Sequence, residues 1–169
     1  MLQLKKVLKC SENVVIQLLK QKLSLFKSNQ LIKTYPVSTS KYGIGNCSGS
    51  NKTPLGLHKI SNKIGRNAPI GSVFIKRRNT GKVAEIRGKA ANQPQDLITS
   101  RILRLVGLER RVNKGLGIDS FQRCIYIHGT PEEWLIGRPA SHGCIRMKNR
   151  DVIELFNLVK RNTPVNIKK

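Results

Sequence analysis

The stretch from Ile127 to Met147 constrains this chain more than any other, because it brings two histidines and a cysteine within seventeen residues. A thiol is a useful nucleophile only as a thiolate, so Cys144 needs a nearby base. His142 is two residues away, and in an extended segment that spacing puts both side chains on one face. His128 can meet the thiol only if the chain doubles back, and the prolines and glycine between them permit that reversal.

Residue types around Cys144 also indicate how a reacting carbonyl would be held. Gly143 lacks a side chain, so the backbone N–H groups beside it can approach a carbonyl oxygen and form an oxyanion hole. The segment therefore favours a Cys–His acyl-transfer site.

Two alternatives compete with this interpretation. Cysteine and histidine are often buried structural residues. A zinc site made from Cys124, His128, His142 and Cys144 is also conceivable. If 124–128 is a strand, however, its two ends stand about 13 Å apart, which is too far for ligands that each lie about 2 Å from one ion. The spacing disfavours zinc.

The residues His128-Gly129-Thr130 and Ser141-His142-Gly143-Cys144-Ile145-Arg146 together resemble the signature of the L,D-transpeptidase catalytic domain. This is the YkuD-like family, which cross-links bacterial peptidoglycan through a cysteine. Segments 53–58 and 101–120 also resemble parts of the family sequence, and the likeness runs from about Val14 to Ile167.

The resemblance implies a mostly β fold: a single sandwich-like catalytic domain over 13–169 with one or two helices, after an N-terminal extension over 1–12. It implies Cys144 as nucleophile, His128 as proton acceptor and donor, and the carbonyl of Gly129 as the group that orients His128. The backbone of His142, Gly143 and Cys144 would form the oxyanion hole. Ser141 would support the loop by hydrogen bonding. The resemblance calls for no cofactor and no metal.

Arg146 has two interpretations. Next to the nucleophile, its cation could favour the thiolate or hold a substrate carboxylate. It could equally be one more member of a basic surface. Trp134 and Tyr126 either line the groove or fill the wall, and His58 is expected at the surface or packed in the wall.

By the same resemblance, Cys144 attacks the carbonyl after an L-centre in a tetrapeptide stem, releases D-alanine and passes the acyl group to an amine. That is a transferase of peptidoglycan and cell-wall biogenesis, with a role in cell shape and sensitivity to carbapenems. If water takes the acyl group, the protein is instead a hydrolase, an L,D-carboxypeptidase. A non-catalytic basic module that binds polyanions is a third alternative.

The charge balance is strongly basic, with 32 Lys and Arg residues against 9 Asp and Glu residues and a net charge of +23. Such a field attracts polyanions, which makes acidic cell-envelope polymers candidate partners alongside peptidoglycan stem peptides. Nucleic acid is not expected, because no DNA- or RNA-binding motif is present and aromatic residues are only 5%.

The first residues are basic, but no apolar run of about 7–15 residues follows them, so we recognise no signal peptide. No stretch reaches the length of a transmembrane helix. The family implies the cell envelope or periplasm, and the sequence leaves the cytoplasm open. Four scattered cysteines do not make a disulfide framework, and we expect free thiols, with a Cys10–Cys47 bridge as the alternative.

Periodicity and turn residues predict short strands and one helix. Asn149 is expected to cap the helix, and Val152, Leu155, Phe156 and Val159 form its apolar stripe. Gly-, Ser- and Asn-rich residues 38–53 are expected to form a loop at the site. The turn of a hairpin is expected at 79–81. Strands are predicted at 13–19, 23–26, 30–37, 57–60, 72–78, 82–87, 100–106, 121–128 and 165–167.

Overall fold

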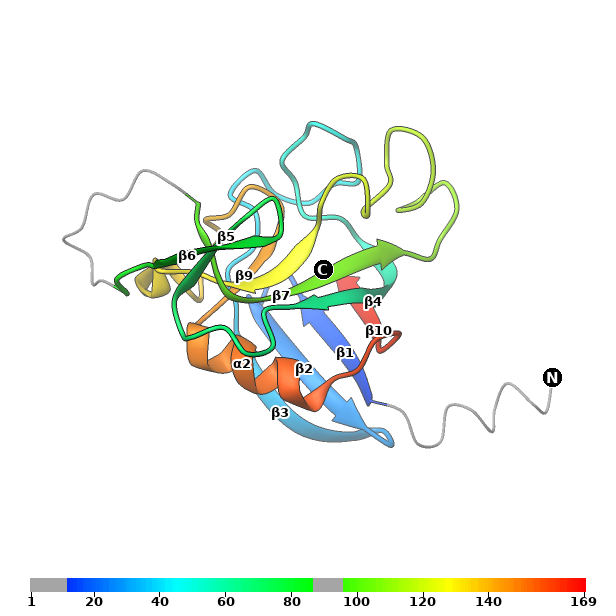
Figure 1. Cartoon of the computed structure of the whole chain (residues 1–169). Coiled ribbons are helices and arrows are strands. Elements are labelled where there is room, and N and C mark those ends of the chain that lie inside the picture. The colour runs from blue at the N-terminus through cyan, green and yellow to red at the C-terminus, as the bar shows by residue number, and fades with distance from the viewer. Residues whose placement is uncertain (1–11, 87–95) are drawn as a thin grey trace.

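The protein is described from a computed structural model that covers residues 12–86 and 96–169. Its elements in chain order (Figure 1) are β1 (Glu12–Gln17), β2 (Lys22–Lys27), β3 (Gln30–Pro36), β4 (Gly56–Ile64), β5 (Ser72–Ile75), β6 (Arg78–Val83), β7 (Ile98–Gly107), β8 (Tyr126–Gly129), the 3-10 helix η1 (Glu133–Leu135), β9 (Ile145–Met147), α2 (Asn149–Leu158) and β10 (Pro164–Lys168). The expectation of a mostly β fold is confirmed.

All described strands belong to one sheet, with the order β3-β2-β1-β10-β4-β7-β5-β6. β1, β2 and β3 form the antiparallel meander that the sequence predicts, and the C-terminal strand β10 inserts between β1 and β4, parallel to β1. β8 leaves this path: it pairs antiparallel with β7 and parallel with β9. The strands that carry the two halves of the motif are therefore neighbours.

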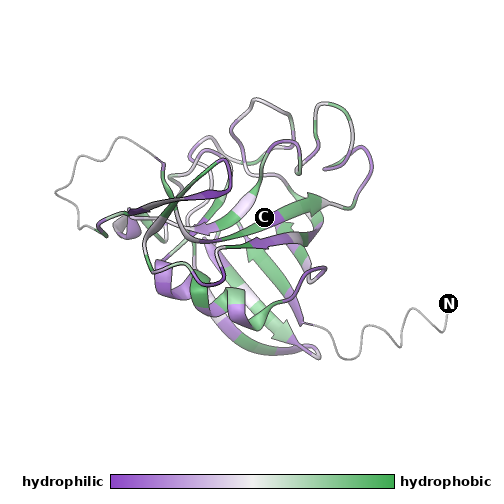
Figure 2. Ribbon diagram, in the orientation of Figure 1, coloured by the Kyte–Doolittle hydropathy of each residue, from purple (hydrophilic) through white to green (hydrophobic). Residues whose placement is uncertain are grey.

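One hydrophobic core takes buried side chains from most of the strands and from α2. The four predicted stripe residues of the helix and its C-cap are all at most 2% exposed. Because a single cluster draws on β1, β2, β10, β4 and β7 to β9, the sheet must curve around it, which gives the sandwich-like form. Figure 2 shows hydrophobic residues concentrated along these strands. Burial of this cluster is the main driving force of the fold.

β7 is the strand from which the site is built. It pairs with β4 and β5 along one edge and with β8 along the other. Its ladder with β8 is interrupted at Ser100 and Arg101, between the Thr99–Gly129 and Ile102–His128 pairs, and Ser100 has φ +63°. Bulges of this kind redirect a strand. Here the bulge turns the Ser100 hydroxyl toward the start of α2.

Asn149 is not the N-cap that its residue type suggested. Lys148 occupies that position, and the Asn149 side chain is fully buried. Its Oδ1 accepts hydrogen bonds from the hydroxyls of Thr99 and Ser100, both at 2.6 Å, and its Nδ2 donates to the Thr130 carbonyl at 2.7 Å. Glu133 accepts from both Nδ2 and the backbone N–H of Asn149. Asn149 thus ties α2 to β7 and to the end of β8.

The position predicted for the turn of the hairpin between β5 and β6 was also wrong. β5 and β6 reverse at Lys76 and Arg77, both with positive φ, whereas Gly81 lies within β6 at an irregularity of the ladder. A two-residue turn with positive φ at both positions matches the twist of the flanking strands. That match outweighs the usual preference for glycine, and the glycine serves the irregularity instead.

Other expectations lie partly outside the described residues. The proposed extension over 1–12 is undescribed except for Glu12, which begins β1, and Cys10 falls in the undescribed part. Cys47, Cys124 and Cys144 are free thiols. Among the described residues, no helix is both long and apolar enough to span a membrane.

Replacing Asn149 with alanine should strongly destabilise the fold. The change leaves the buried hydroxyls of Thr99 and Ser100, the Thr130 carbonyl and Glu133 without their shared partner, and it should lower the free energy of unfolding by about 3 kcal/mol. Urea denaturation followed by circular dichroism measures this loss.

Asn157→Ala is the matched control, because Asn157 is exposed on the same helix. That variant should unfold within about 0.5 kcal/mol of wild type. Equal stability losses in the two variants would contradict the role given to Asn149.

Candidate active site

The parallel pairing of β8 and β9 brings the two halves of the motif together. Its register matches Ile127 with Ile145, His128 with Arg146 and Gly129 with Met147. Side chains alternate between faces along a strand. Ile127, Ile145 and Met147 belong to the main core, so His128 and Arg146 lie on the opposite face. Cys144 packs against a second buried cluster, which includes Tyr126, on that face.

The predicted reversal between the two histidines is confirmed. After β8 the chain passes through η1 and turns at Gly137, which has φ +97° and donates its N–H to the Val37 carbonyl at 2.9 Å. This anchor against the end of β3 returns the chain to Ser141 and then to β9.

His128 is held in one orientation. It is 1% exposed, and its Nδ1 lies 2.7 Å from the carbonyl oxygen of Gly129. A carbonyl can only accept, so Nδ1 carries the proton and Nε2 is the acceptor. A Cβ at position 129 would meet the Thr99 carbonyl oxygen at 2.7 Å, which explains the glycine. Burial lowers the pKa of His128, while the nearby Asp96 carboxylate acts in the opposite direction.

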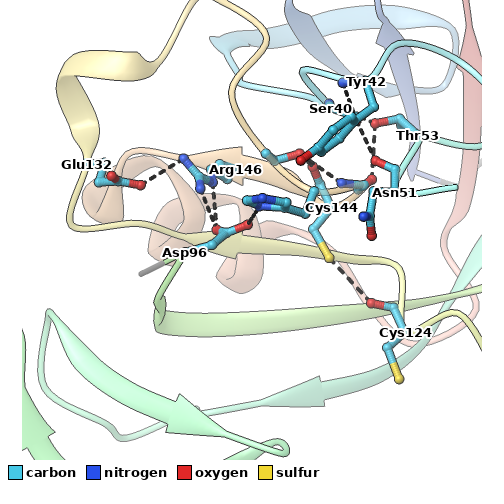
Figure 3. Close-up of polar contacts among 12 residues, drawn as sticks. Ser40, Tyr42, Asn51, Thr53, Asp96, Cys124, Glu132, Cys144 and Arg146 are labelled. Carbon is cyan, nitrogen blue, oxygen red and sulfur yellow. Dashed lines mark hydrogen bonds and ion pairs between the residues drawn. The ribbon is translucent and has the colours of Figure 1, made fainter. Parts of the chain in front are cut away.

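The thiol of Cys144 points toward the chain just before β8. Its Sγ donates to the Cys124 carbonyl at 3.3 Å and accepts from the Tyr126 N–H at 3.4 Å. In Figure 3 the side chain of Cys124 points away from that of Cys144. Burial raises the pKa of the Cys144 thiol to about 12, so in this state the group is protonated and needs a base before it can attack.

The segment Ser141–Cys144 is not extended, so the expectation that His142 and Cys144 share a face was wrong. Gly143 has φ +124°, and the chain bends there. The His142 imidazole contacts Asp96 at 3.0 Å and packs against the Tyr42 ring, with centroids 5.6 Å apart. Glycine is required at 143 by this φ, which side chains rarely adopt.

Hydrogen bonds fix the bend. The Ser141 hydroxyl donates to the Cys144 carbonyl at 2.6 Å and accepts from the Gly143 N–H at 3.2 Å. The Gly143 N–H, one of the three expected oxyanion donors, is therefore engaged in this state. Among the described residues, no hydrogen bond uses the N–H of His142 or Cys144.

The loop over 38–53 borders the motif as expected. Ser38 exchanges backbone hydrogen bonds with Arg146, and Ser40 forms a bridge with Ser141. Thr53 donates its hydroxyl to the Gly143 carbonyl at 3.1 Å and accepts from the Ser40 N–H at 3.0 Å. These contacts, drawn in part in Figure 3, hold the bend from the side opposite β8.

Of the two interpretations of Arg146, the basic surface is wrong; burial raises the pKa of the Cys144 thiol, and the Arg146 charge acts against this in the direction that favours the thiolate. Arg146 is 2% exposed, so it is not part of a basic surface. Its Nε and Nη2 lie 2.8 and 2.6 Å from Asp96 Oδ1, and its Nη1 lies 3.0 Å from Glu132 Oε2. Two carboxylates therefore already compensate the cation. A buried charge needs such partners, because desolvation is costly.

Sequence reasoning missed Asp96 and Glu132. Figure 3 shows Asp96 between Arg146 and the bend, with Glu132 on the far side of the guanidinium. Burial acts to raise the pKa of Asp96, but His128, Arg146 and the hydrogen bond with His142 together hold it below its ordinary value. Asp96 is 46 residues from His142 in the chain, and no local pattern marks it.

The other candidates are wall residues. His58 is fully buried, and its ring nitrogens contact the Gly56 carbonyl at 2.9 Å and the Ser120 hydroxyl at 2.8 Å. Tyr126 is 5% exposed and its hydroxyl accepts a hydrogen bond from Arg77 at 3.0 Å. Trp134 is partly exposed in η1.

Cys124 and His128 are not the two ends of one extended strand, so the separation expected between them as zinc ligands does not apply. β8 begins at Tyr126, and Cys124 has φ +56° outside the strand. Within residues 12–86 and 96–169, no group of three or more His, Cys, Asp or Glu side chains is arranged to hold a metal ion.

Sequence comparison finds two similar proteins named YkuD. The protein from Bacillus licheniformis is 54% identical over 41 residues, which are 24% of this chain and 25% of the relative. The protein from Bacillus subtilis is 51% identical over 43 residues, 25% of this chain and 26% of the relative. The matched stretches thus span about a quarter of each relative.

Solved structures share the fold. An L,D-transpeptidase named LdtMt1, in complex with imipenem, superposes with a TM-score of 0.56 at 17% identity, over 94% of this chain and 59% of the other. L,D-transpeptidase 3 from Mycobacterium tuberculosis, with a faropenem-derived adduct, gives 0.56 at 15% identity, over 94% and 60%. Both chains are longer than this one, and at such low identity the likeness establishes the fold alone.

The family model described as the L,D-transpeptidase catalytic domain matches residues 11–167, nearly the whole chain. The resemblance drawn from the two motif segments is confirmed. With this match, and with the fold and the His128–Cys144 arrangement described above, the chain belongs to the L,D-transpeptidase catalytic domain family.

Proposed function

We propose that this protein is a peptidoglycan L,D-transpeptidase with Cys144 as nucleophile and His128 as general base. The proposal is supported by the register of β8 and β9, in which His128 faces away from the main core, and by the packing of Cys144, the residue just before β9, against the second cluster on that face. Family membership supplies the reaction class.

In the first half-reaction, His128 Nε2 takes the thiol proton as Cys144 Sγ forms a bond to the carbonyl carbon after the L-centre of a tetrapeptide stem. The carbonyl oxygen becomes an oxyanion. When the intermediate collapses, the bond to D-alanine breaks, and the departing amine takes the proton from His128. A thioester on Cys144 and free D-alanine result.

In the second half-reaction, an amine from a neighbouring stem attacks the thioester carbon. His128 accepts the proton that this amine loses, and the carbon–sulfur bond breaks. The sulfur recovers its proton from His128, so the enzyme returns to its starting state with one new amide bond formed.

Backbone N–H groups at the bend are suited to hold the oxyanion. The donors of His142 and Cys144 are not used by other hydrogen bonds of the described residues, and the Gly143 donor can be released only if its contact with Ser141 breaks. We therefore assign the His142 and Cys144 N–H groups as the ready donors. Such preorganised donors give the largest single contribution in many acyl-transfer enzymes.

We further propose peptidoglycan stem peptides as substrates and the cell envelope as the place of action. The family is one of cell-wall enzyme domains. The net charge of +23 would also draw the protein toward acidic envelope polymers. That attraction should weaken as salt concentration rises.

Replacing Cys144 with alanine should abolish acyl-enzyme formation. Intact mass spectrometry of the wild type with a tetrapeptide-bearing muropeptide should show an adduct on the protein, and analysis of the muropeptides should show cross-linked dimers. Cys144→Ala should show neither. Cys47→Ala, which removes an exposed free thiol elsewhere, is the control and should behave as wild type.

The same experiment separates the transferase from a hydrolase. An adduct with only the tripeptide product would mean that water is the acceptor and that the protein is an L,D-carboxypeptidase. Absence of both adduct and product in the wild type, under conditions where the protein is folded, would refute the proposed nucleophile.

Carbapenems should acylate Cys144, and the rate should depend on pH through His128. Because burial lowers the pKa of His128, its neutral form should persist below the ordinary value of about 6.5. The rate of adduct formation should therefore stay high as pH falls through 6.5 and decline only at lower pH. His128→Ala should slow the reaction by about 100-fold or more.

Time-resolved intact mass spectrometry from pH 5 to 8 gives these rates. A decline centred at or above the ordinary histidine pKa would contradict the assignment of a buried base, as would an unchanged rate in His128→Ala.

A further inference from the structure

Asp96 has no role in the mechanism proposed above, although it contacts two residues of the site. One oxygen of its carboxylate, Oδ1, accepts two hydrogen-bonding contacts from the guanidinium of Arg146, at 2.8 and 2.6 Å. The other, Oδ2, lies 3.0 Å from the Nδ1 of His142. One side chain from the segment just before β7 thus links the strand β9 to the bend that precedes the proposed nucleophile.

Several charged or ionisable side chains surround Asp96. Arg146 and His142 contact it directly, and His128 and Cys144 are close enough for its charge to shift their pKa values. Glu132 is the second carboxylate on Arg146. Burial, and more weakly the charge of Arg146, oppose protonation of His128, whereas the Asp96 carboxylate and the Gly129 carbonyl favour it. Glu132 contacts only the far side of the guanidinium, and the interactions that shift His128 do not include it.

We infer that Asp96 is a positioning residue of this site: its carboxylate clamps the His142 imidazole to the Arg146 guanidinium, and its negative charge stabilises the imidazolium that His128 becomes when it takes the thiol proton. The inference rests on the proposed function for its catalytic meaning, but the clamp and its charge can be tested without substrate.

The clamp acts on the oxyanion segment through geometry. The His142 ring is held by Asp96, and the Tyr42 ring packs against it. The backbone that follows carries the proposed donors of His142 and Cys144. Without Asp96 the ring loses its polar anchor, although the hydrogen bonds of Ser141 and Thr53 to the bend remain.

The charge acts on His128 in a direction that can be predicted. An imidazolium forms in a buried site, where opposite charges interact strongly. Removing the negative charge should make His128 harder to protonate, so its pKa should fall. The same charge opposes the thiolate of Cys144, so the thiol pKa should fall as well. Asp96 therefore sets the pH range in which the pair works.

Asp96→Asn tests the charge while it keeps the size of the side chain. In a histidine titration followed by NMR, the variant should lower the pKa of His128 by about one unit or more relative to wild type. The distant, buried His58 should titrate as in wild type. With a muropeptide substrate, the acid limb of kcat/KM should move to lower pH by the same amount, and the maximum should fall about tenfold as the His142 anchor weakens.

Glu132→Gln is the matched control. It removes the other carboxylate on Arg146 but leaves His142 and Asp96 in contact, so it should leave the His128 titration unmoved. Asp96→Glu keeps the charge and should keep the pKa of His128 near the wild-type value. This variant also guards against an Asp96→Asn protein that fails to fold, which thermal unfolding would reveal.

An unmoved His128 titration in Asp96→Asn would overturn the inference. So would equal shifts in Asp96→Asn and Asp96→Glu, because the charge would then not be the cause, and so would a shift in Glu132→Gln as large as that in Asp96→Asn. Failure of the wild type to form an acyl adduct would instead refute the proposed function, and the titration would still decide the role of Asp96.

Discussion

The site depends on one backbone interaction, the parallel ladder between β8 and β9. Its register puts His128 beside Arg146 and Ile127 beside Ile145. A shift by a single residue would turn each side chain to the other face, burying the imidazole in the apolar core and exposing the isoleucines. The apolar residues of the two strands therefore hold the geometry of the proposed catalytic site, since only this register buries them. Chemistry and core stability are enforced by the same pairing.

Around this ladder, polar groups are placed by irregularities in the backbone. The bulge at Ser100 aims a hydroxyl at Asn149, and Cys124, in the left-handed region, carries the carbonyl that accepts from the Cys144 thiol. The bend at Gly143 is a third such irregularity. Each of these positions departs from regular strand geometry, so the backbone groups there have fewer hydrogen-bond partners within the sheet. The hydrogen bonds of Asn149 and Ser141 compensate for those lost partners.

The charge balance around Cys144 differs from the strongly basic balance of the whole chain. The protein carries a net charge of +23, yet Arg146, whose charge acts on the Cys144 thiol, is buried between Asp96 and Glu132, two of its nine acidic residues. Burial is the largest cause that raises the pKa of the Cys144 thiol and that lowers the pKa of His128, and the charges of Asp96 and Arg146, respectively, act in the same directions. In the proposed mechanism the thiol therefore keeps its proton until His128 accepts it during attack on the substrate carbonyl. The basic charge of the chain and the compensated charges around Cys144 are separate properties. The first suits long-range attraction of polyanions, and the second suits the short-range proton transfer proposed between Cys144 and His128.

The sequence by itself determined the family, the identity of the nucleophile and base candidates, the mostly β class and the apolar stripe of α2. Those features are local: a motif at fixed spacing, or a period along one element. Only the tertiary structure decided that Asn149 is a buried link instead of a cap, that Arg146 is paired and that Asp96 belongs to the site. These outcomes depend on contacts between residues up to 50 apart in the chain, and no periodic pattern encodes the partner of a buried charge.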